Sequence, residues 1–246
     1  MRRPTPTGAA VTRRHGVARA ISKLGGGSRS QAVQWVGDGR VSVNGRVVRD
    51  AERPVRPGID RIDIDGRPLS VAARIVLMLN KPRGLVTTRQ DEHGRDTVYR
   101  CFEGARLPWL APVGRLDKAS EGLLLFSNDP VWAGRITDPA SAQTKTYHVQ
   151  IDRLPDAQLL SGLERGVVLG GEHLECRRAR CLRTGDTNAW LEIVLAEGRN
   201  RQIRRLLEAF DVAVLRLVRV AIGRLSLGDL PKGRWRMLTR PEIESL

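Results

Sequence analysis

The amino-acid sequence predicts an α+β protein with a small N-terminal domain of helix-helix-hairpin type and a larger second domain. Its 246 residues are enough for one small and one large core. Positive charge is concentrated at the start, since residues 1–70 carry 14 basic and 6 acidic side chains. In the remainder, apolar alternating segments are separated by short amphipathic ones. This pattern predicts a mixed, largely antiparallel sheet flanked by helices.

The first elements follow from local signals. Residues 1–13, rich in Arg, Pro and Thr, are expected to form a mobile basic tail. Val17–Leu24 is predicted to be a short helix that ends at the triple glycine behind it. Ser28 and Ser30 are candidate caps for a second helix, which should end near residue 37.

A hairpin is predicted next. Val41–Val43 and Arg46–Val48 flank Asn44-Gly45, a dipeptide whose tolerance of positive φ suits a two-residue turn. Ile62–Gly66 alternates as one more strand, and Pro68–Ala73 is expected to be the linker to the second domain.

This order of elements over residues 14–70 resembles the S4 RNA-binding domain, which is named after a ribosomal protein. The resemblance rests on Ser28-Arg29, which opens the second helix, and on Gly39–Gly45, which leads into the hairpin. It implies that basic side chains around the motif face RNA phosphates, namely Arg29, Arg40 and Arg46. The residues by themselves also allow that these arginines only keep a small domain soluble.

The second segment begins with Ile75–Leu79, which is expected to be a buried strand. The turn after it, Asn80–Gly84, should expose two cations, Lys81 and Arg83. Residues 85–113 are rich in turn formers and predict no regular element. The further elements expected are strands at Leu123–Ser127, Lys145–Ile151, Ala179–Leu182 and Trp190–Leu195, and helices near Val131–Ile136 and Ala157–Leu163.

Gly114-Arg115-Leu116-Asp117 stands just before the apolar run at 122–126. A carboxylate beside a buried strand costs several kcal/mol to desolvate unless a cation or hydrogen bonds compensate it. Asp117 is therefore a candidate functional residue. Taken alone, the segment also fits an ordinary turn with a solvated Asp.

A second candidate segment runs from Glu197 to Phe210. Asn200 is expected to cap a helix whose apolar residues, from Ile203 to Phe210, share one face. The cations on the opposite face are Arg201, Arg204 and Arg205. A helix start that carries guanidinium groups suits a phosphate or a carboxylate, although an ordinary amphipathic surface helix has the same pattern.

Composition excludes several classes of protein. The three cysteines form no Cys-x-x-Cys pair and the four histidines are scattered, so neither a disulfide framework nor a metal site is expected. No apolar run approaches the roughly 20 residues of a spanning helix, and we expect a cytoplasmic protein with no membrane contact. The net charge of +15 favours a nucleic-acid partner.

Together these motifs resemble the RsuA-type RNA pseudouridine synthases. The resemblance runs from residue 75 to the C-terminus, and an S4-like domain in front is the arrangement common in that family. It rests on four motifs in family order: Gly114–Leu125, Lys145-Thr146-Tyr147, Glu197–Arg205, and Ile222-Gly223 with Leu230–Gly233. It implies that residues 75–246 form a pseudouridine synthase catalytic domain.

Carried over residue by residue, the resemblance makes Asp117 the catalytic carboxylate and Tyr147 the residue stacked on the target uracil. Arg204 would be the cation paired with Asp117. Arg115 would fill the gap that the flipped nucleotide leaves, and Ile222 would pack against the base or Tyr147.

Further cations of these motifs are expected to bind the RNA, namely Lys145, Arg201 and Arg205. Some relatives carry His at the position of Arg201 and Lys at that of Arg204. The positive charge is therefore retained at the second position, whereas the role of the first differs among relatives.

The reaction so implied is the isomerisation of uridine to pseudouridine, which needs no external group donor or oxidant, so no cofactor is expected. Asp117 could attack C1′ or C6, or remove the 2′ proton, and the residues leave these routes open. The motif Arg199-Asn200-Arg201-Gln202 looks closer to that of large-subunit relatives than to that of small-subunit ones, so the resemblance implies large-subunit ribosomal RNA as substrate. The protein is expected to act as a monomer on this RNA or on a pre-ribosomal particle.

Two functions of other classes fit parts of the sequence. A non-catalytic ribosome-assembly or ribosomal RNA-binding protein could use the same basic front domain, but it would not need Asp117. A nucleoside hydrolase would normally use two carboxyl groups, for which Glu121 and Asp129 are the nearby candidates.

Overall fold

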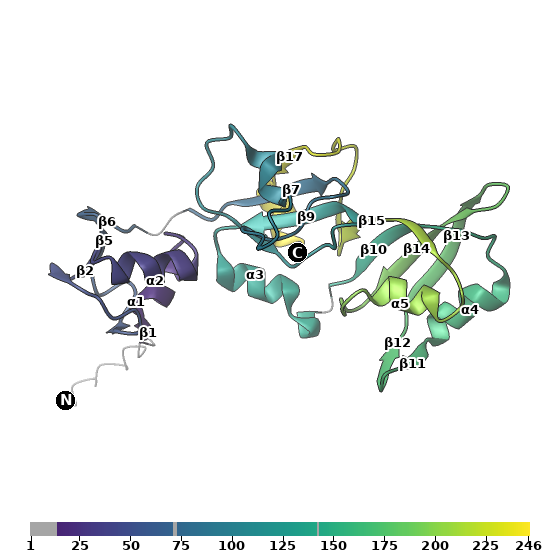
Figure 1. Cartoon of the computed structure of the whole chain (residues 1–246), viewed down its shortest axis with the longest axis horizontal. Helices are drawn as coiled ribbons and strands as arrows, with labels where there is room; N and C mark the ends of the chain where they lie inside the picture. Colours follow the sequence, from purple (N-terminus) through teal and green to yellow (C-terminus); the bar gives the residue numbers. More distant parts are fainter. Residues whose placement is uncertain (1–13, 71–72, 142) are drawn as a thin grey trace, which may run out of the picture. The chain divides into compact units, whose positions relative to one another are not determined.

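The computed structural model describes residues 14–70, 73–141 and 143–246, and the chain divides into two compact units, residues 1–74 and 75–246 (Figure 1). Each unit has a hydrophobic core of its own. The predicted tail at 1–13 lies outside the described residues. Within the described part of the chain, none of the helices is long and apolar enough to cross a membrane.

The first unit packs two helices against short strands. Its elements are β1 (His15–Gly16), α1 (Val17–Lys23), α2 (Arg29–Gly37), β2 (Val41–Val43), β3 (Arg46–Val47), β4 (Pro54–Val55), β5 (Ile62–Ile64) and β6 (Arg67–Pro68). Ser28 caps α2 through a reciprocal pair of hydrogen bonds with Gln31, as its position before the helix predicts. The apolar faces of both helices meet β2 and β5 in the core.

The hairpin prediction is confirmed, because Asn44 and Gly45 have φ of 50° and 79° between β2 and β3. The predicted linker starts too early. Pro68 belongs to β6, which pairs with β5 at the edge of the small sheet, a position where the missing N–H of proline costs no hydrogen bond. Residues 71–72 of that predicted linker lie outside the described part of the chain.

The second unit is built on one large sheet. Its strands are β7 (Val76–Lys81), β8 (Ala111–Val113), β9 (Glu121–Ser127), β10 (Lys145–Ile151), β13 (Arg178–Thr184), β14 (Ala189–Leu195), β15 (Val214–Ile222), β16 (Leu225–Ser226) and β17 (Trp235–Met237). They run in the order β13-β14-β10-β15-β9-β7-β17, with β8 beside β9 and β16 beside β15. All pairs in this sheet are antiparallel except β15 with β9, which confirms the predicted mixed, largely antiparallel sheet.

Helices cover the two halves of this sheet separately (Figure 1). The remaining elements are α3 (Pro130–Thr137), α4 (Ala157–Arg165), α5 (Gln202–Glu208), α6 (Arg240–Glu244), the 3-10 turns η1 (Val98–Phe102) and η2 (Pro139–Ser141), and the small hairpin β11 (Val167–Leu169) and β12 (Glu172–Leu174). α4 and α5 pack on β10 and β14, whereas α3 packs on β7 and β9. The predicted helices near 131–136 and 157–163 are thus confirmed.

The two halves of the sheet join at a single narrow place, the parallel pairing of β9 with β15. Only Val218 with Glu121 and Arg219 with Gly122 are in register there. Gly122 has φ of 100°, and a Cβ on it would lie 2.2 Å from the carbonyl oxygen of Arg219. Glycine is therefore required where the two backbones meet.

An ion cluster lies directly beside this β9–β15 junction. Glu121 is almost fully buried and accepts hydrogen bonds from the Arg216 guanidinium at 3.1 and 3.2 Å and from the Lys232 ammonium. Burial opposes ionisation of Glu121, but these two cations outweigh it and lower the pKa of its carboxyl. Strands β9 and β15 and the segment before β17 are thereby tied together.

Strand β15, the element that completes the junction, was not predicted. Its pattern is atypical because Arg219 points with Leu217 toward the buried side, while Arg216 and Val218 lie on the other face. Alternation of apolar and polar residues therefore fails to mark its two faces.

We expect Gly122→Ala to lower the free energy of unfolding by at least about 2 kcal/mol, because the new Cβ overlaps backbone atoms and the φ is unfavourable for alanine. Gly134→Ala is the control. Gly134 lies in α3 with no atom within 4 Å of a new Cβ, so this change should raise stability by about 0.5–1 kcal/mol. Urea denaturation measures both, and equal effects of the two substitutions would contradict the proposed close approach.

Candidate active site

A cavity of about 400 Å³ opens in the second unit, next to the β9–β15 junction. Its walls come from the segment 113–120, from β10 and β15, and from residues 197–204 at the start of α5. Seven of the residues singled out in the sequence line it: Arg115, Asp117, Lys145, Tyr147, Arg201, Arg204 and Ile222. Segments more than 100 residues apart in the sequence are thus brought together at one place.

The backbone around Asp117 is held by several hydrogen bonds. The Thr87 hydroxyl donates to the carbonyl of Leu116 at 2.7 Å and accepts from its N–H at 3.3 Å. The N–H of Ser120 donates to the carbonyl of Asp117 at 3.0 Å, and that of Gly84 donates to the carbonyl of Lys118 at 2.8 Å. The Asp117 side chain itself remains 39% exposed, so a fixed backbone presents an accessible carboxylate.

Lys81, a buried residue of β7, supports the loop that carries Asp117. The prediction that it lies exposed in a turn is wrong, because β7 extends through Lys81 and its side chain is fully buried. Its ammonium group donates to the carbonyls of Ser120 at 2.8 Å, Asp117 at 3.1 Å and Pro82 at 3.2 Å. Three carbonyl acceptors satisfy the three donors, which explains how a lysine can be buried here.

Burial lowers the pKa of Lys81 from 10.5 to about 8, and the nearby negative charge of Asp117 opposes this decrease. The hydrogen bonds of Lys81 thus connect strand β7 to the loop that carries Asp117.

The floor of the cavity is formed by neighbouring positions on β10 and β15. Tyr147 is paired in register with Arg219, and Lys145 with Ile222. Tyr147 is 8% exposed, within the predicted row of inward residues that continues with Val149 and Ile151. An aromatic ring and an aliphatic side chain thus lie in the cavity together with cations, a combination that suits a flat polar ring carrying a phosphate.

The arginine that pairs with Asp117 differs from the expected one. Arg201 Nη1 lies 3.7 Å from Asp117 Oδ2, whereas Arg204 donates to the carbonyls of Val214 at 3.3 Å and Ala119 at 3.4 Å. Burial and the neighbouring charge of Arg201 lower the pKa of Arg204, and the charge of Asp117 acts in the opposite direction. Arg201 and Arg204 are therefore both close enough to Asp117 for their positive charges to interact with its carboxylate.

Helix α5 begins later than predicted, and this explains why Arg201 rather than Arg204 is paired with Asp117. Its N-cap is Arg201, with left-handed φ of 48°, and not Asn200. Arg201 consequently lies outside the helix and lines the cavity with a half-exposed side chain, while Arg204 lies in the first turn and donates to backbone carbonyls. The turn before α5 is held by the side chain of Gln202, which accepts a hydrogen bond from the N–H of Arg199 at 3.1 Å.

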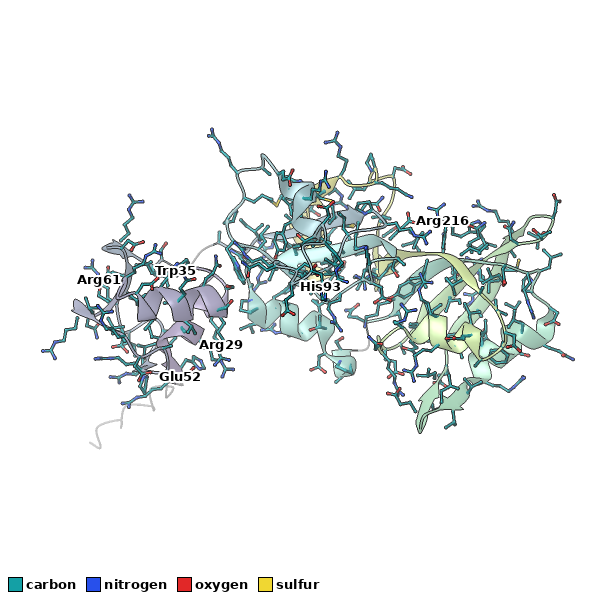
Figure 2. All side chains as sticks on the ribbon, in the orientation of Figure 1. Arg29, Trp35, Glu52, Arg61, His93 and Arg216 are labelled. Carbon is teal, nitrogen blue, oxygen red and sulfur yellow. The ribbon has the colours of Figure 1, made fainter. Side chains whose placement is uncertain are left out.

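The other predicted residues lie elsewhere. Arg205 does not line the cavity and forms an ion pair with Glu172 at 2.8 Å. Arg29, Arg40 and Arg46 belong to the first unit; Arg29 is paired with Glu52 (Figure 2) and Arg40 with Asp65.

The carboxylates considered for a hydrolase are not in the cavity either. Glu121 is held in the buried ion cluster, and Asp129 caps α3 through the N–H groups of Val131 and Trp132. Among the described residues, no group of three His, Cys, Asp or Glu side chains could hold a metal ion.

Three residues that organise this site were not predicted: Lys81, Thr87 and Arg219. For Lys81 a signal was present, because it is one of only five lysines and directly continues an apolar strand. Thr87 lies in the turn-rich region 85–113, where no periodicity marks it, and Arg219 lies in β15, whose residue pattern does not predict a strand.

We expect the pH dependence of stability to reveal the buried Lys81. Because its pKa is lower in the folded than in the unfolded chain, the unfolded chain binds more protons between about pH 8 and 10.5, and stability from this group rises with pH in that window. The free energy of unfolding of the wild type, minus that of Lys81→Met, should rise by up to about 3 kcal/mol across it. A constant difference over this range would contradict the assignment.

Comparisons with known proteins agree with this geometry. Residues 75–209 match the family model of RNA pseudouridylate synthases, and residues 17–59 match that of the S4 domain. The chain is 34% identical over 232 residues to an RNA pseudouridine synthase of Aquifex aeolicus, covering 94% of this chain and 92% of that protein.

Two further similarities extend over most of the chain. It is 38% identical to the ribosomal large subunit pseudouridine synthase B of Escherichia coli, covering 88% of this chain and 77% of that protein. A crystal structure of a pseudouridylate synthase superimposes with a TM-score of 0.65 at 30% identity, covering 94% of this chain and 99% of that one. The chain therefore belongs to the RNA pseudouridine synthases, a family of isomerases, with an S4 domain in front of the synthase fold.

Proposed function

We propose that this protein converts uridine to pseudouridine in large-subunit ribosomal RNA, with Asp117 as the catalytic carboxylate. The observation that carries the proposal is the placement of Asp117 in a cavity with Tyr147, Arg201 and Arg204. The choice of RNA is supported by relatives named ribosomal large subunit pseudouridine synthase B, from Bacillus subtilis at 33% identity and from Escherichia coli at 38%.

The reaction is an isomerisation, so its atoms balance without a co-reactant. The bond between C1′ and N1 breaks, the uracil turns within the cavity, and a bond between C1′ and C5 forms. C5 loses its proton, and N1 gains one. The protein must therefore hold the detached base, stabilise the sugar while it is electron-poor, and supply a proton acceptor.

Asp117 is placed to act on the sugar or the base. Attack on C1′, attack on C6 and removal of the 2′ proton each require an ionised carboxylate with one exposed face. Arg201 at 3.7 Å and the neighbouring Arg204 place positive charge beside this carboxylate. The hydrogen bonds of Lys81 and Thr87 to the loop backbone keep the carboxylate from moving away from the substrate.

The floor of the cavity is assigned to the base. Tyr147 stacks on the extruded uracil, Ile222 packs against the base or the tyrosine, and the tyrosine hydroxyl is available to assist loss of the C5 proton. Arg115 is exposed at the edge of the cavity, where it can replace the flipped base in the RNA stack. Lys145 and Arg201 bind the RNA backbone, and Arg205 contributes from outside the cavity.

We further propose that residues 14–70 bind the RNA and residues 75–246 carry out the reaction, without a cofactor. In the S4 domain, Arg40 lies 5.7 Å from the ring centre of Trp35, which adds an aromatic face to the basic surface. Arg29 and Arg46 extend that surface toward RNA phosphates. The protein would act as a monomer in the cytoplasm, on ribosomal RNA or a pre-ribosomal particle.

Mapping of pseudouridine in ribosomal RNA tests this proposal. Cells that lack the protein should lose pseudouridine at one site, or a few, in the large-subunit RNA. Wild-type protein should restore the modification, and Asp117→Asn should fail to restore it at equal protein level.

If no site disappears, or if Asp117→Asn restores the lost site, the proposed catalysis fails. The second result would favour a protein that acts only by binding RNA.

A further inference from the structure

Arg219 is a buried cation of the cavity whose hydrogen bonds are incomplete. Its side chain lines the cavity although the residue is only 6% exposed. Nε donates to the carbonyl of Leu123 at 2.8 Å, but Nη2 is buried and has no hydrogen-bond partner among the described residues. A guanidinium group buried in this way costs several kcal/mol unless a ligand completes its contacts.

A second cation lies near it on the same floor. The pKa of Lys145 is lowered by burial and further by the positive charge of Arg219. Within the described part of the chain, neither of them forms an ion pair with a carboxylate. The two carboxylates that line the cavity are already engaged, Asp117 with Arg201 and Glu197 with Arg199.

A purely structural role explains only part of this arrangement. The hydrogen bond to Leu123 fixes β15 to β9 beside the junction, and a single donor is enough for it. This structural role of Arg219 does not explain why a second positive charge, Lys145, faces the same cavity without an anion. Two like charges in a half-enclosed space repel each other, and an anion between them removes that repulsion.

We propose that Arg219 and Lys145 together bind the phosphate group of the extruded nucleotide. The inference rests on the proposed function, since it assumes that a uridine of an RNA chain enters the cavity. Tyr147 is paired in register with Arg219, so a base stacked on the tyrosine brings its own sugar phosphate close to this pair. Arg219 is thus a substrate-binding residue beyond those that the motifs indicated.

A phosphate fits the pair better than a uracil carbonyl does. A neutral carbonyl oxygen accepts a hydrogen bond but does not cancel two positive charges, whereas a phosphodiester carries a full negative charge and two free oxygens. Guanidinium and ammonium groups also suit these oxygens, since the first offers two parallel donors and the second acts as a point charge.

The test measures RNA binding in the Asp117→Asn protein, so that no turnover occurs. The probe is an RNA stem-loop of the large subunit that carries the target uridine, with the phosphate on its 5′ or its 3′ side replaced by an uncharged methylphosphonate. One of the two replacements should weaken binding about tenfold. Adding Arg219→Met should weaken binding of the natural RNA by a similar factor.

The decisive measurement combines Arg219→Met with the RNA that carries the methylphosphonate. Arg219→Met should cause little further loss on the RNA that lacks the contacted charge, because both changes remove the same interaction. Its effect should persist on an RNA with an abasic target nucleotide. Arg224→Met is the matched control, since Arg224 is exposed, two residues beyond β15, and does not line the cavity; it should leave the affinity unchanged.

Independent, additive losses from the two changes would overturn the proposal. So would an effect of Arg219→Met that disappears with the abasic target, which would assign the arginine to the base. If Arg219→Met does not fold, Lys145→Met tests the same pair by the same cycle. Failure of the proposed function is distinguishable, because it would appear as absence of pseudouridine in this RNA after incubation with wild-type protein.

Discussion

The close approach of β9 to β15 is the constraint on which the rest of the second unit depends. Gly122 lets the two backbones meet, and the sheet halves that carry α3 and α4–α5 become one surface. The loop with Asp117 precedes β9, and the floor with Tyr147 lies on β10, beside β15. A carboxylate from one half of the sheet therefore lines the same cavity as an aromatic ring from the other half. The buried cluster of Glu121 fixes this junction on its other side.

The cavity next to the junction is electrostatically unbalanced in a way that suits RNA. Its carboxylates are paired with arginines, while Lys145 and Arg219 have no described acidic partner. Such a site is unfavourable in the free protein and becomes favourable when a polyanion enters it. Lys81 shows the contrasting solution, since three backbone carbonyls accept hydrogen bonds from its ammonium group and it holds the loop that carries Asp117.

Much of this could be predicted from the sequence because the relevant signals were local. Ser28 before a helix, Asn44-Gly45 between strands and the alternation around Tyr147 each report on a few neighbouring residues, and all three predictions are confirmed. The exceptions depend on contacts between distant segments. Lys81 is buried only because the carbonyls of Asp117 and Ser120 reach it, and β15 hides its pattern because Arg219 faces inward. The exchange of Arg204 for Arg201 beside Asp117 follows from the left-handed backbone of one residue, which no periodicity reveals.

We propose that the β9–β15 junction presents Asp117 as the group that performs the chemistry, separately from RNA binding. The most direct measurement is the single-turnover rate of pseudouridine formation by purified Asp117→Asn on a large-subunit RNA fragment at saturating protein, compared with wild type. We expect the rate to fall by at least about 10⁴-fold, since the group that acts on the substrate is removed, while the Kd for the RNA changes less than about threefold. A rate near that of the wild type with unchanged Kd would contradict this role of Asp117.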